Sequence, residues 1–226
     1  MRNRARQRAT PAAVHVCVQP TAIGPLTLAV AGDALVYCGF ATPLAVRRRM
    51  ARTAPDWCVQ MLHSTVTTSI LQEVTDQLQA FLDGRSHGFS LPLDLRLASV
   101  FTQQVLTAVD SLAPYGRTAT YGELAAALGR PRAARAVGTA LGANPLCVVL
   151  PCHRIVGSTG RLTGYAGGLR AKRYLLDLEE SAGHSAAADR LEPGTGAAAL
   201  PSGFLRCGCQ HAVSGPSAVR QRPLAQ

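Results

Sequence analysis

The first third of the chain carries three short apolar runs separated by turn residues. The runs span residues 14–18, 26–30 and 34–40 and are typical of β-strands. Gly24-Pro25 and Gly32-Asp33 stand between them, and both pairs favour tight turns. The pattern therefore predicts an antiparallel three-stranded meander.

Residues 64–82 show the period of a helix instead of short apolar runs. Its apolar positions fall on one face, and Gly84 ends the pattern. These positions are Ile70, Leu71, Val74, Leu78, Phe81 and Leu82. Residues 89–95 are again typical of extended chain, and residues 93–98 are a reasonable linker. The first half thus has the character of a small α+β unit.

After the linker the pattern is mainly helical. Helices are predicted over residues 100–112, 121–128 and 132–141. Thr120 and Glu123 have the spacing of a capping box at the start of the second helix. The second and third helices are joined by a glycine-containing turn, which is typical of a helix-turn-helix.

The third of these helices carries few long side chains. Ala133, Ala134, Ala136, Gly138 and Ala140 leave it nearly smooth apart from two arginines, Arg132 and Arg135. A helix that reads the major groove of DNA needs long polar side chains. This helix instead suits close approach to a narrow groove with one projecting arginine, or, alternatively, tight packing against its neighbours.

Candidate chemistry follows the apolar run at residues 146–150, which is predicted to be a buried strand. Cys152 and His153 come directly after it, and a further helix pattern covers residues 169–180. A cysteine reacts as its thiolate and needs a base or a positive field. Adjacent side chains on a strand point to opposite faces, so contact between the two requires a turn at residues 151–154 or a bridging water.

A carboxylate that orients the imidazole would complete a triad. Asp177, Glu179 and Glu180 are the downstream candidates. The alternative is a buried structural cysteine beside a histidine with ordinary partners.

Composition adds a partner class. The 226 residues are 47% hydrophobic, enough for a real core, and the formal net charge is +10. Nine basic residues and one acid, Glu123, lie between residues 115 and 175. Such a local excess can supply phosphate contacts, although a solvated basic surface is an equal alternative.

The ends of the chain differ from the middle. Residues 1–13 form an arginine-rich arm, residues 183–226 form a low-complexity tail, and both are predicted to be disordered. The sequence shows neither a secretory signal nor a spanning run, so no membrane association is expected and the location is predicted to be cytoplasmic.

Seven cysteines in such a chain are expected to be free thiols. Cys207, Cys209 and His211 resemble metal ligands, but they lie in the tail without a second ligand pair. No metal site is therefore predicted.

Several spaced motifs together resemble the active-site half of the O6-alkylguanine-DNA alkyltransferases, over about residues 14–180. The downstream motifs are Asn144-Pro145, Pro151-Cys152-His153-Arg154, Gly160, Gly164-Tyr165, Gly167-Gly168-Leu169, Lys172 and Leu175-Leu176 through Glu179. The upstream motifs are Pro114-Tyr115-Gly116, Thr120 to Ala125 and Ala134 to Gly138.

The resemblance implies an α+β fold with a small N-terminal α/β domain, ribonuclease H-like, over residues 14–95. A helical C-terminal domain over residues 96–182 would contain a winged helix-turn-helix, bind DNA and carry the alkyl acceptor. The implied activity is a single, irreversible transfer from O6-methylguanine, with O4-methylthymine expected as a further substrate. The implied partner is double-stranded DNA containing O6-alkylguanine, bound by a monomer without any cofactor.

The resemblance also implies a role for each matched residue. Cys152 would accept the alkyl group, His153 would draw its proton through a water, and Glu179 would hold the imidazole. Asn144 would brace the cysteine turn, and Tyr121 would donate a hydrogen bond to the guanine ring.

The remaining matched residues would contact DNA or line the substrate pocket. Arg135 would fill the gap left by a flipped nucleotide while its helix lies in the minor groove. The DNA-contacting set is completed by Ala134, Ala136, Gly138, Arg132 and Tyr165, and the pocket set is Ile155 and Ala166.

Some positions depart from the family pattern. Phe101-Thr102 and Val105-Leu106 replace the usual pairs in the helix at residues 100–112, and Ala166 stands where some members have a hydroxyl residue. The zinc-binding cysteine and histidine set of some members is not evident. The replaced pairs in the helix concern packing more than chemistry. The family contact at the position of Ala166 uses the backbone N–H, which alanine keeps.

Two other classes of function fit parts of the pattern. A non-catalytic DNA-lesion or transcriptional binding protein would use the same helices without an acceptor, and Cys152 with His153 and Glu179 argues against it. A cysteine hydrolase would leave the alanine-rich helix and the basic surface without a role.

Overall fold

The computed structural model describes residues 13–62 and 68–188, with the backbone alone over residues 182–188. The predicted arm at residues 1–13, apart from Ala13, lies outside this part, as does the predicted tail beyond Ala188. The candidate metal ligands Cys207, Cys209 and His211 are therefore also outside it.

The N-terminal half is built on a four-stranded sheet with the order β3-β2-β1-β4. Its strands are β1 (Ala13–Gln19), β2 (Leu26–Ala31), β3 (Ala34–Gly39) and β4 (Cys58–Met61). The first three pair antiparallel, which confirms the predicted meander, and β4 joins β1 in parallel.

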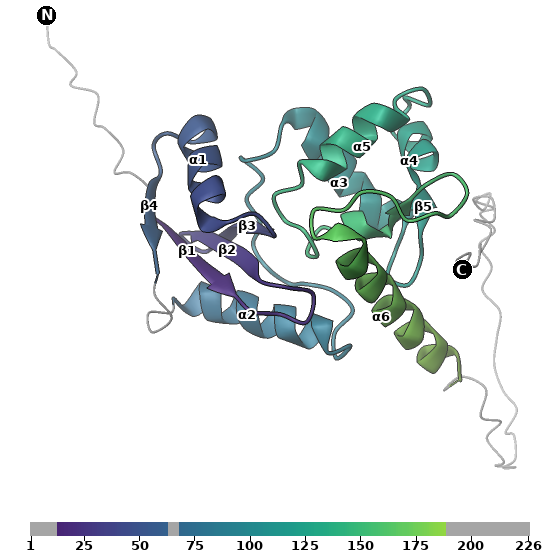
Figure 1. Ribbon diagram of the computed structural model, residues 1–226, viewed down its shortest axis with the longest axis horizontal. Coiled ribbons are helices and arrows are strands. Elements are labelled where there is room, and N and C mark those ends of the chain that lie inside the picture. Colours follow the sequence, from purple (N-terminus) through teal and green to yellow (C-terminus); the bar gives the residue numbers. More distant parts are fainter. Residues whose placement is uncertain (1–12, 63–67, 189–226) are drawn as a thin grey trace, which may run out of the picture.

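Two helices cover opposite faces of this sheet. They are α1 (Pro43–Thr53) and α2 (Ser69–Leu82). Alternate strand residues divide between the two faces, with Leu28 and Val30 packed in the cluster of α2 and Ala29 and Ala31 in the cluster of α1. The result is a three-layer unit, seen at the left of Figure 1.

The sequence pattern missed α1 and β4. The helix has a clear start, since Thr42 caps the N–H of Ala45 and Pro43 occupies the first turn. Only Val46 and Met50 are buried along it, so its apolar stripe is too thin to stand out. The strand is short and mostly exposed at the sheet edge.

The C-terminal half is helical around a second core. Its elements are α3 (Val100–Leu112), β5 (Ala119–Thr120), α4 (Tyr121–Ala127), α5 (Ala134–Gly142), a 3₁₀ turn (Cys152–Arg154), β6 (Ile155–Val156) and α6 (Gly168–Ala188). The three helices α3, α4 and α5 share one apolar cluster. The predicted capping box between Thr120 and Glu123 is present in both directions.

The apolar run at residues 146–150 is not the predicted strand. It contributes one isolated bridge, between Leu146 and Cys38, and then turns. Val148 has a φ of 73°, which a β-branched residue rarely adopts. The strand prediction failed because burial alone gives an apolar run, and this run is buried as a compact turn rather than as a ladder.

The observed architecture is mixed α+β, as expected, with a small sheet and helices. The last helix begins at Gly168 and continues to Ala188, beyond the predicted span of 169–180. None of the helices in the described ranges is long and apolar enough to cross a membrane.

Candidate active site

The predicted nucleophile lies at the start of a tight turn. Pro151 precedes the 3₁₀ turn that contains Cys152 and His153, so the two side chains do not alternate as they would on a strand. Cys152 is 6% exposed and His153 is fully buried. The structure has the turn, but no hydrogen bond joins the two side chains directly, because His153 Nε2 contacts Glu179 and Nδ1 has no partner among the described residues.

Asn144 holds this turn through its side-chain amide. Its Nδ2 donates to the Cys152 Sγ at 3.2 Å and to the Leu150 carbonyl at 2.9 Å. Its Oδ1 accepts from the Leu146 N–H at 2.8 Å. One buried amide therefore fixes both ends of the turn and touches the sulfur.

A second thiol stands beside the first. The Cys147 Sγ donates to the Asn144 carbonyl at 3.6 Å, and Cys147 is 2% exposed. A hydrogen bond from Cys147 lowers the pKa of Cys152; burial opposes this, and Asn144 and the charge of Lys172 lower the pKa further. The pKa of Cys147 is raised well above its usual value, first by the same contact. Cys152 is thus the more acidic thiol of the pair.

Lys172 is the chain's single lysine, and it is fully buried and interacts electrostatically with Cys152. Its ammonium donates to the Ile155 carbonyl at 2.5 Å and to the Thr163 carbonyl at 3.1 Å. Burial lowers the pKa of Lys172 to about 8, while Cys152 acts to raise it. The sequence motif contained Lys172 without a role, although one lysine among 22 arginines was a signal.

Glu179 is the carboxylate that contacts the histidine. His153 Nε2 and Glu179 Oε1 are 2.8 Å apart, and both side chains are buried. Burial lowers the pKa of His153 and outweighs the opposite effect of Glu179. The imidazole is therefore neutral near neutral pH. Its other nitrogen, Nδ1, is buried without a hydrogen-bond partner among the described residues.

Arg154 shares this carboxylate, a role that the sequence did not reveal. Its Nε lies 2.9 Å from Glu179 Oε2, and its Nη1 lies 2.8 Å from Asp110 Oδ1. Burial acts to raise the pKa of Glu179, but bonds from His153 and Arg154 lower it overall. The Gly116 N–H also donates to Glu179 at 3.2 Å.

The thiol opens into a cavity of about 530 Å³ between α5 and the loop before α6. The cavity is lined by Tyr121, Ala134, Arg135, Gly138, Leu141, Gly142, Cys152, Thr163, Gly164, Tyr165 and Ala166. Tyr121 accepts a hydrogen bond from the Thr163 hydroxyl at 3.1 Å, which leaves its own proton free to be donated. A cleft of this size can hold a single nucleobase.

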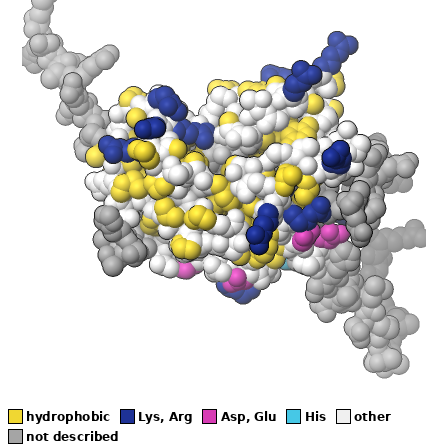
Figure 2. All heavy atoms as spheres, in the orientation of Figure 1, with side chains coloured by type: hydrophobic (Ala, Val, Ile, Leu, Met, Phe, Trp, Pro, Cys, Tyr) yellow, Lys and Arg dark blue, Asp and Glu magenta, His cyan; other side chains and the backbone are white. Residues whose placement is uncertain are grey.

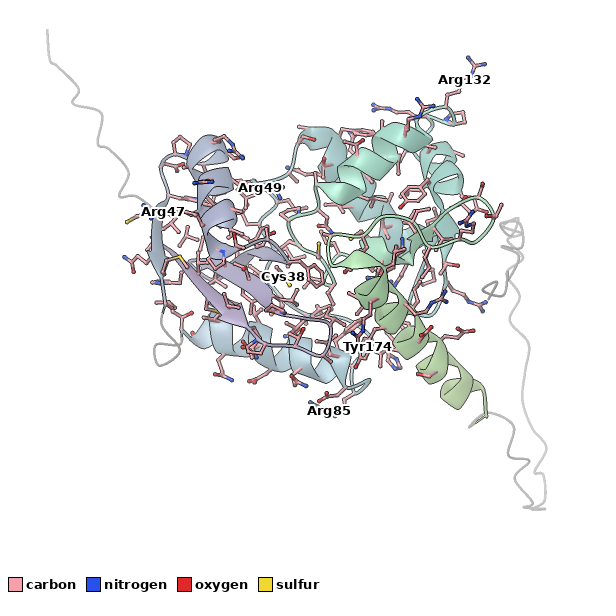
Figure 3. All side chains as sticks on the ribbon, viewed as in Figure 1. Cys38, Arg47, Arg49, Arg85, Arg132 and Tyr174 are labelled. Atoms are coloured by element: carbon pink, nitrogen blue, oxygen red, sulfur yellow. The ribbon has the colours of Figure 1, made fainter. Side chains whose placement is uncertain are left out.

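Three predicted contact residues are not among those that line this cavity. The Ile155 side chain is fully buried and belongs to the apolar cluster of α3, α4 and α5. Ala136 and Arg132 are exposed outside the cavity. Arg132 projects away from the molecule at the turn before α5 (Figure 3).

The loop that closes the cavity rests on the N-terminal half. Phe40 follows β3 and meets the ring of Tyr165 edge-on, with centroids 5.6 Å apart. A Cβ at Gly167 would lie 2.4 Å from the Phe40 ring, so this position requires glycine. The sheet thereby sets where the cavity wall stands.

Basic side chains border this region. On the face shown in Figure 2, Lys and Arg side chains lie over α1, at the α4–α5 corner and lower down beside the few acidic ones. The exposed residues here include Arg130, Arg132 and Arg135. This charge distribution suits a polyanion at the mouth of the cavity.

Comparison with known proteins connects this site to a family. Residues 100–181 match the model of the 6-O-methylguanine DNA methyltransferase, DNA binding domain. Methylated-DNA--protein-cysteine methyltransferase of Mycobacterium tuberculosis (strain H37Rv) is 40% identical over 168 residues, which cover 74% of this chain and 93% of the relative. The protein of that name from Methanosarcina acetivorans is 36% identical, over 74% and 99%.

Solved structures agree with these relatives. A crystal structure of Mycobacterium tuberculosis OGT in complex with DNA superposes with a TM-score of 0.60 and 39% identity, over 74% of this chain and 94% of that one. The O6-methylguanine-DNA methyltransferase of Pyrococcus kodakaraensis, at 21% identity and a TM-score of 0.56, shares the fold.

Proposed function

The chain belongs to the methylated-DNA--protein-cysteine methyltransferase family, and from this premise we propose that it repairs DNA by taking the alkyl group of O6-methylguanine onto Cys152. One contact carries the assignment of the acceptor. Asn144 holds the Cys152 sulfur at 3.2 Å, on a turn that opens into a base-sized cavity.

The proposed reaction is a displacement at the alkyl carbon. His153 draws the proton of Cys152 through a water at Nδ1, and Glu179 fixes the opposite nitrogen. The thiolate attacks the methyl carbon, an S–C bond forms, and the C–O6 bond breaks with its electron pair left on the guanine. Tyr121 donates a hydrogen bond to the guanine ring and stabilises that charge.

The product is a thioether, which no group in the cavity reverses. A thioether lacks the electrophilic carbonyl of an acyl-enzyme and the exchangeable bond of a disulfide. Each molecule therefore acts once. The neighbouring Lys172 and Asn144 serve the thiolate before the reaction and have no task after it.

Access to the base requires that the nucleotide leave the stack, because O6 lies within the duplex. We assign this step to α4 and α5 acting as a helix-turn-helix with a wing, and we place α5 in the minor groove. Ala134 and Gly138 allow close approach, and Arg135 fills the gap. Arg132, Ala136 and Tyr165 complete the proposed DNA-contacting set.

The remaining assignments follow from this chemistry. O4-methylthymine presents a similar alkyl–oxygen bond on a ring that can take up the leaving charge, so it is a second substrate. Ala166 contributes its backbone N–H to the pocket.

The proposed monomer divides into a supporting domain at residues 14–95, with ribonuclease H-like topology, and an acceptor domain at residues 96–182.

A single mass measurement tests the transfer. The protein is mixed with duplex DNA that contains one O6-methylguanine and is then digested with trypsin. The peptide of residues 136–154 should gain one methyl group on Cys152, and repair should stop at one equivalent. Unmodified protein, or many turnovers per molecule, would exclude the proposal.

Cys152→Ala separates transfer from binding. The variant should lose transfer completely, because no other thiol lines the cavity among the described residues. It should still retard the same duplex in a gel. A variant that neither transfers nor binds would make Cys152 a structural residue.

A further inference from the structure

The transfer chemistry leaves Cys147 without a task. It is buried, and its Sγ lies 3.6 Å from the Asn144 carbonyl, while the side-chain Nδ2 of the same Asn144 donates to the Cys152 Sγ at 3.2 Å. Cys147 and Cys152 lie in the same apolar cluster. Two thiols five residues apart in the chain thus meet at one asparagine.

The two thiols differ in access. Cys152 lines the cavity, whereas Cys147 does not. A small oxidant that enters the cavity therefore meets Cys152 first. A thiolate is the form that peroxide oxidises, and Cys152 is the thiol that ionises more readily because Cys147, Asn144 and Lys172 lower its pKa.

We propose that Cys147 is the resolving thiol of an oxidised acceptor and closes a reversible Cys147–Cys152 disulfide that preserves the single-use cysteine. The proposal rests on the acceptor role of Cys152. It adds a modification site at the same turn.

The two steps balance with hydrogen peroxide as the oxidant. The Cys152 thiolate attacks one peroxide oxygen, the O–O bond breaks, and hydroxide leaves, so Cys152 becomes a sulfenic acid. The Cys147 sulfur then attacks the Cys152 sulfur, the S–O bond breaks, and the thiol proton departs with the hydroxyl as water. An external dithiol restores both thiols by exchange and becomes a disulfide itself.

Oxidation itself prepares Cys147 for the second step. The contact with Cys152 and its negative charge are among the causes that raise the pKa of Cys147. A sulfenic acid is neutral near neutral pH, so the effect of the negative charge is removed once Cys152 is oxidised. Arg49 also acts to lower the pKa of Cys147.

The consequence of lacking a resolving thiol is loss of the protein. A sulfenic acid that meets more peroxide becomes a sulfinic acid, which simple thiols do not reduce. An acceptor that works only once is then consumed without having removed an alkyl group from DNA. The disulfide stops the oxidation of Cys152 at a stage that a dithiol can reverse.

The test uses the full-length protein and one peptide. Residues 136–154 contain both cysteines and no internal trypsin site, so the disulfide appears as a loss of two hydrogen atoms and sulfinic acid as a gain of two oxygen atoms. Parent protein treated with hydrogen peroxide should give the first product. Cys147→Ala and Cys147→Ser should give the second.

Recovery is measured as the methyl groups accepted after dithiothreitol treatment, relative to the unoxidised sample of the same protein. The parent should regain most of its capacity, while both Cys147 variants should stay below about a tenth. Because the mass readout needs no alkylated DNA, failure of methyl transfer and failure of the disulfide are distinguished.

Cys38 supplies the matched control. Cys38, labelled in Figure 3, is buried, and its backbone N–H and carbonyl bond to Pro145 and Cys147, so its backbone is joined to the segment that contains Cys147. Cys38→Ala should still form the disulfide within residues 136–154. A disulfide to Cys38, or equal sulfinic acid in the parent and in Cys147→Ala, would overturn the proposal.

Discussion

At the residue scale, the site depends on buried charged groups that a small number of partners compensate. Glu179 receives hydrogen bonds from His153, Arg154 and the Gly116 backbone. Removal of one member of a buried charged set leaves the others without compensation, and the cost exceeds that of an exposed pair. Arg154 also binds Asp110, which is exposed, so the same ion-pair network allows a buried carboxylate to be compared with an exposed one.

Glu179→Gln should destabilise the protein by about 3–5 kcal/mol, because Arg154 and His153 lose a buried carboxylate. Asp110→Asn should cost less than about 1 kcal/mol, because its carboxylate is mostly exposed. Urea unfolding at neutral pH measures both. Equal costs would mean that burial does not govern this network.

Acid should weaken the parent in two stages. Burial lowers the pKa of His153, so the unfolded chain binds a proton first and stability falls through the histidine range. The lowered pKa of Glu179 adds a further loss as the pH falls through the carboxyl range. In Glu179→Gln the second loss should be missing from urea titrations at decreasing pH.

Lys172→Met should raise the pKa of Cys152, because a nearby positive charge disappears. A thiol whose pKa is higher by one has a thiolate fraction about tenfold lower at any pH well below its midpoint. Alkylation of Cys152 by iodoacetamide, followed by peptide mass at several pH values, should show a slower rate at neutral pH. The two profiles should converge above a pH of about 8, where Lys172 of the parent is also neutral. Superimposable profiles would remove Lys172 from the site.

At the scale of elements, the sequence predicted best where a pattern is long or a cap is explicit. The meander and α3 have clear periods, and the capping box of α4 was visible as Thr120 and Glu123. The turn before Cys152 could not be predicted, because it depends on Asn144 and on a bridge to Cys38, which lies far away in sequence. The resemblance supplied Glu179 among three carboxylates, but Cys147 and Arg154 emerged only from packing.

Arg135→Ala tests the element that we assign to base flipping. Transfer from O6-methylguanine in duplex DNA should slow by about tenfold or more, since an unfilled gap no longer holds the base out. Transfer from the free base should be unchanged. Rapid-quench kinetics provide the measurement, and Arg47→Ala, which removes an exposed arginine of α1 outside the cavity, is the control. An Arg135→Ala protein as fast as the parent on duplex would refute flipping by this residue.

At the scale of the whole molecule, the two halves meet at the cavity. Phe40 supports the loop at Tyr165 and Gly167, and Arg49 on α1 donates to the carbonyls of Leu97 and Ala143. The N-terminal half therefore positions the wall of a site to which it contributes no reacting atom. Figure 1 shows this sheet beside the helical C-terminal half.

Gly167→Ala should displace the loop, because its new Cβ would overlap the Phe40 ring. The overpacking should cost about 1–3 kcal/mol and slow transfer. Phe40→Leu combined with Gly167→Ala should recover part of both losses, since the smaller side chain makes room. Thermal unfolding and single-turnover transfer report the two effects, and purely additive losses in the double variant would argue against this contact.

The bond between His153 and Glu179 spans 26 residues of chain. During synthesis, Cys152 and its base are made before the carboxylate that orients them, and Glu179 lies in the helix that completes the described fold. An unfinished or truncated chain therefore carries the acceptor thiol without its orienting partner. Under the proposed mechanism, the carboxylate that orients His153 becomes available only when α6 has been made.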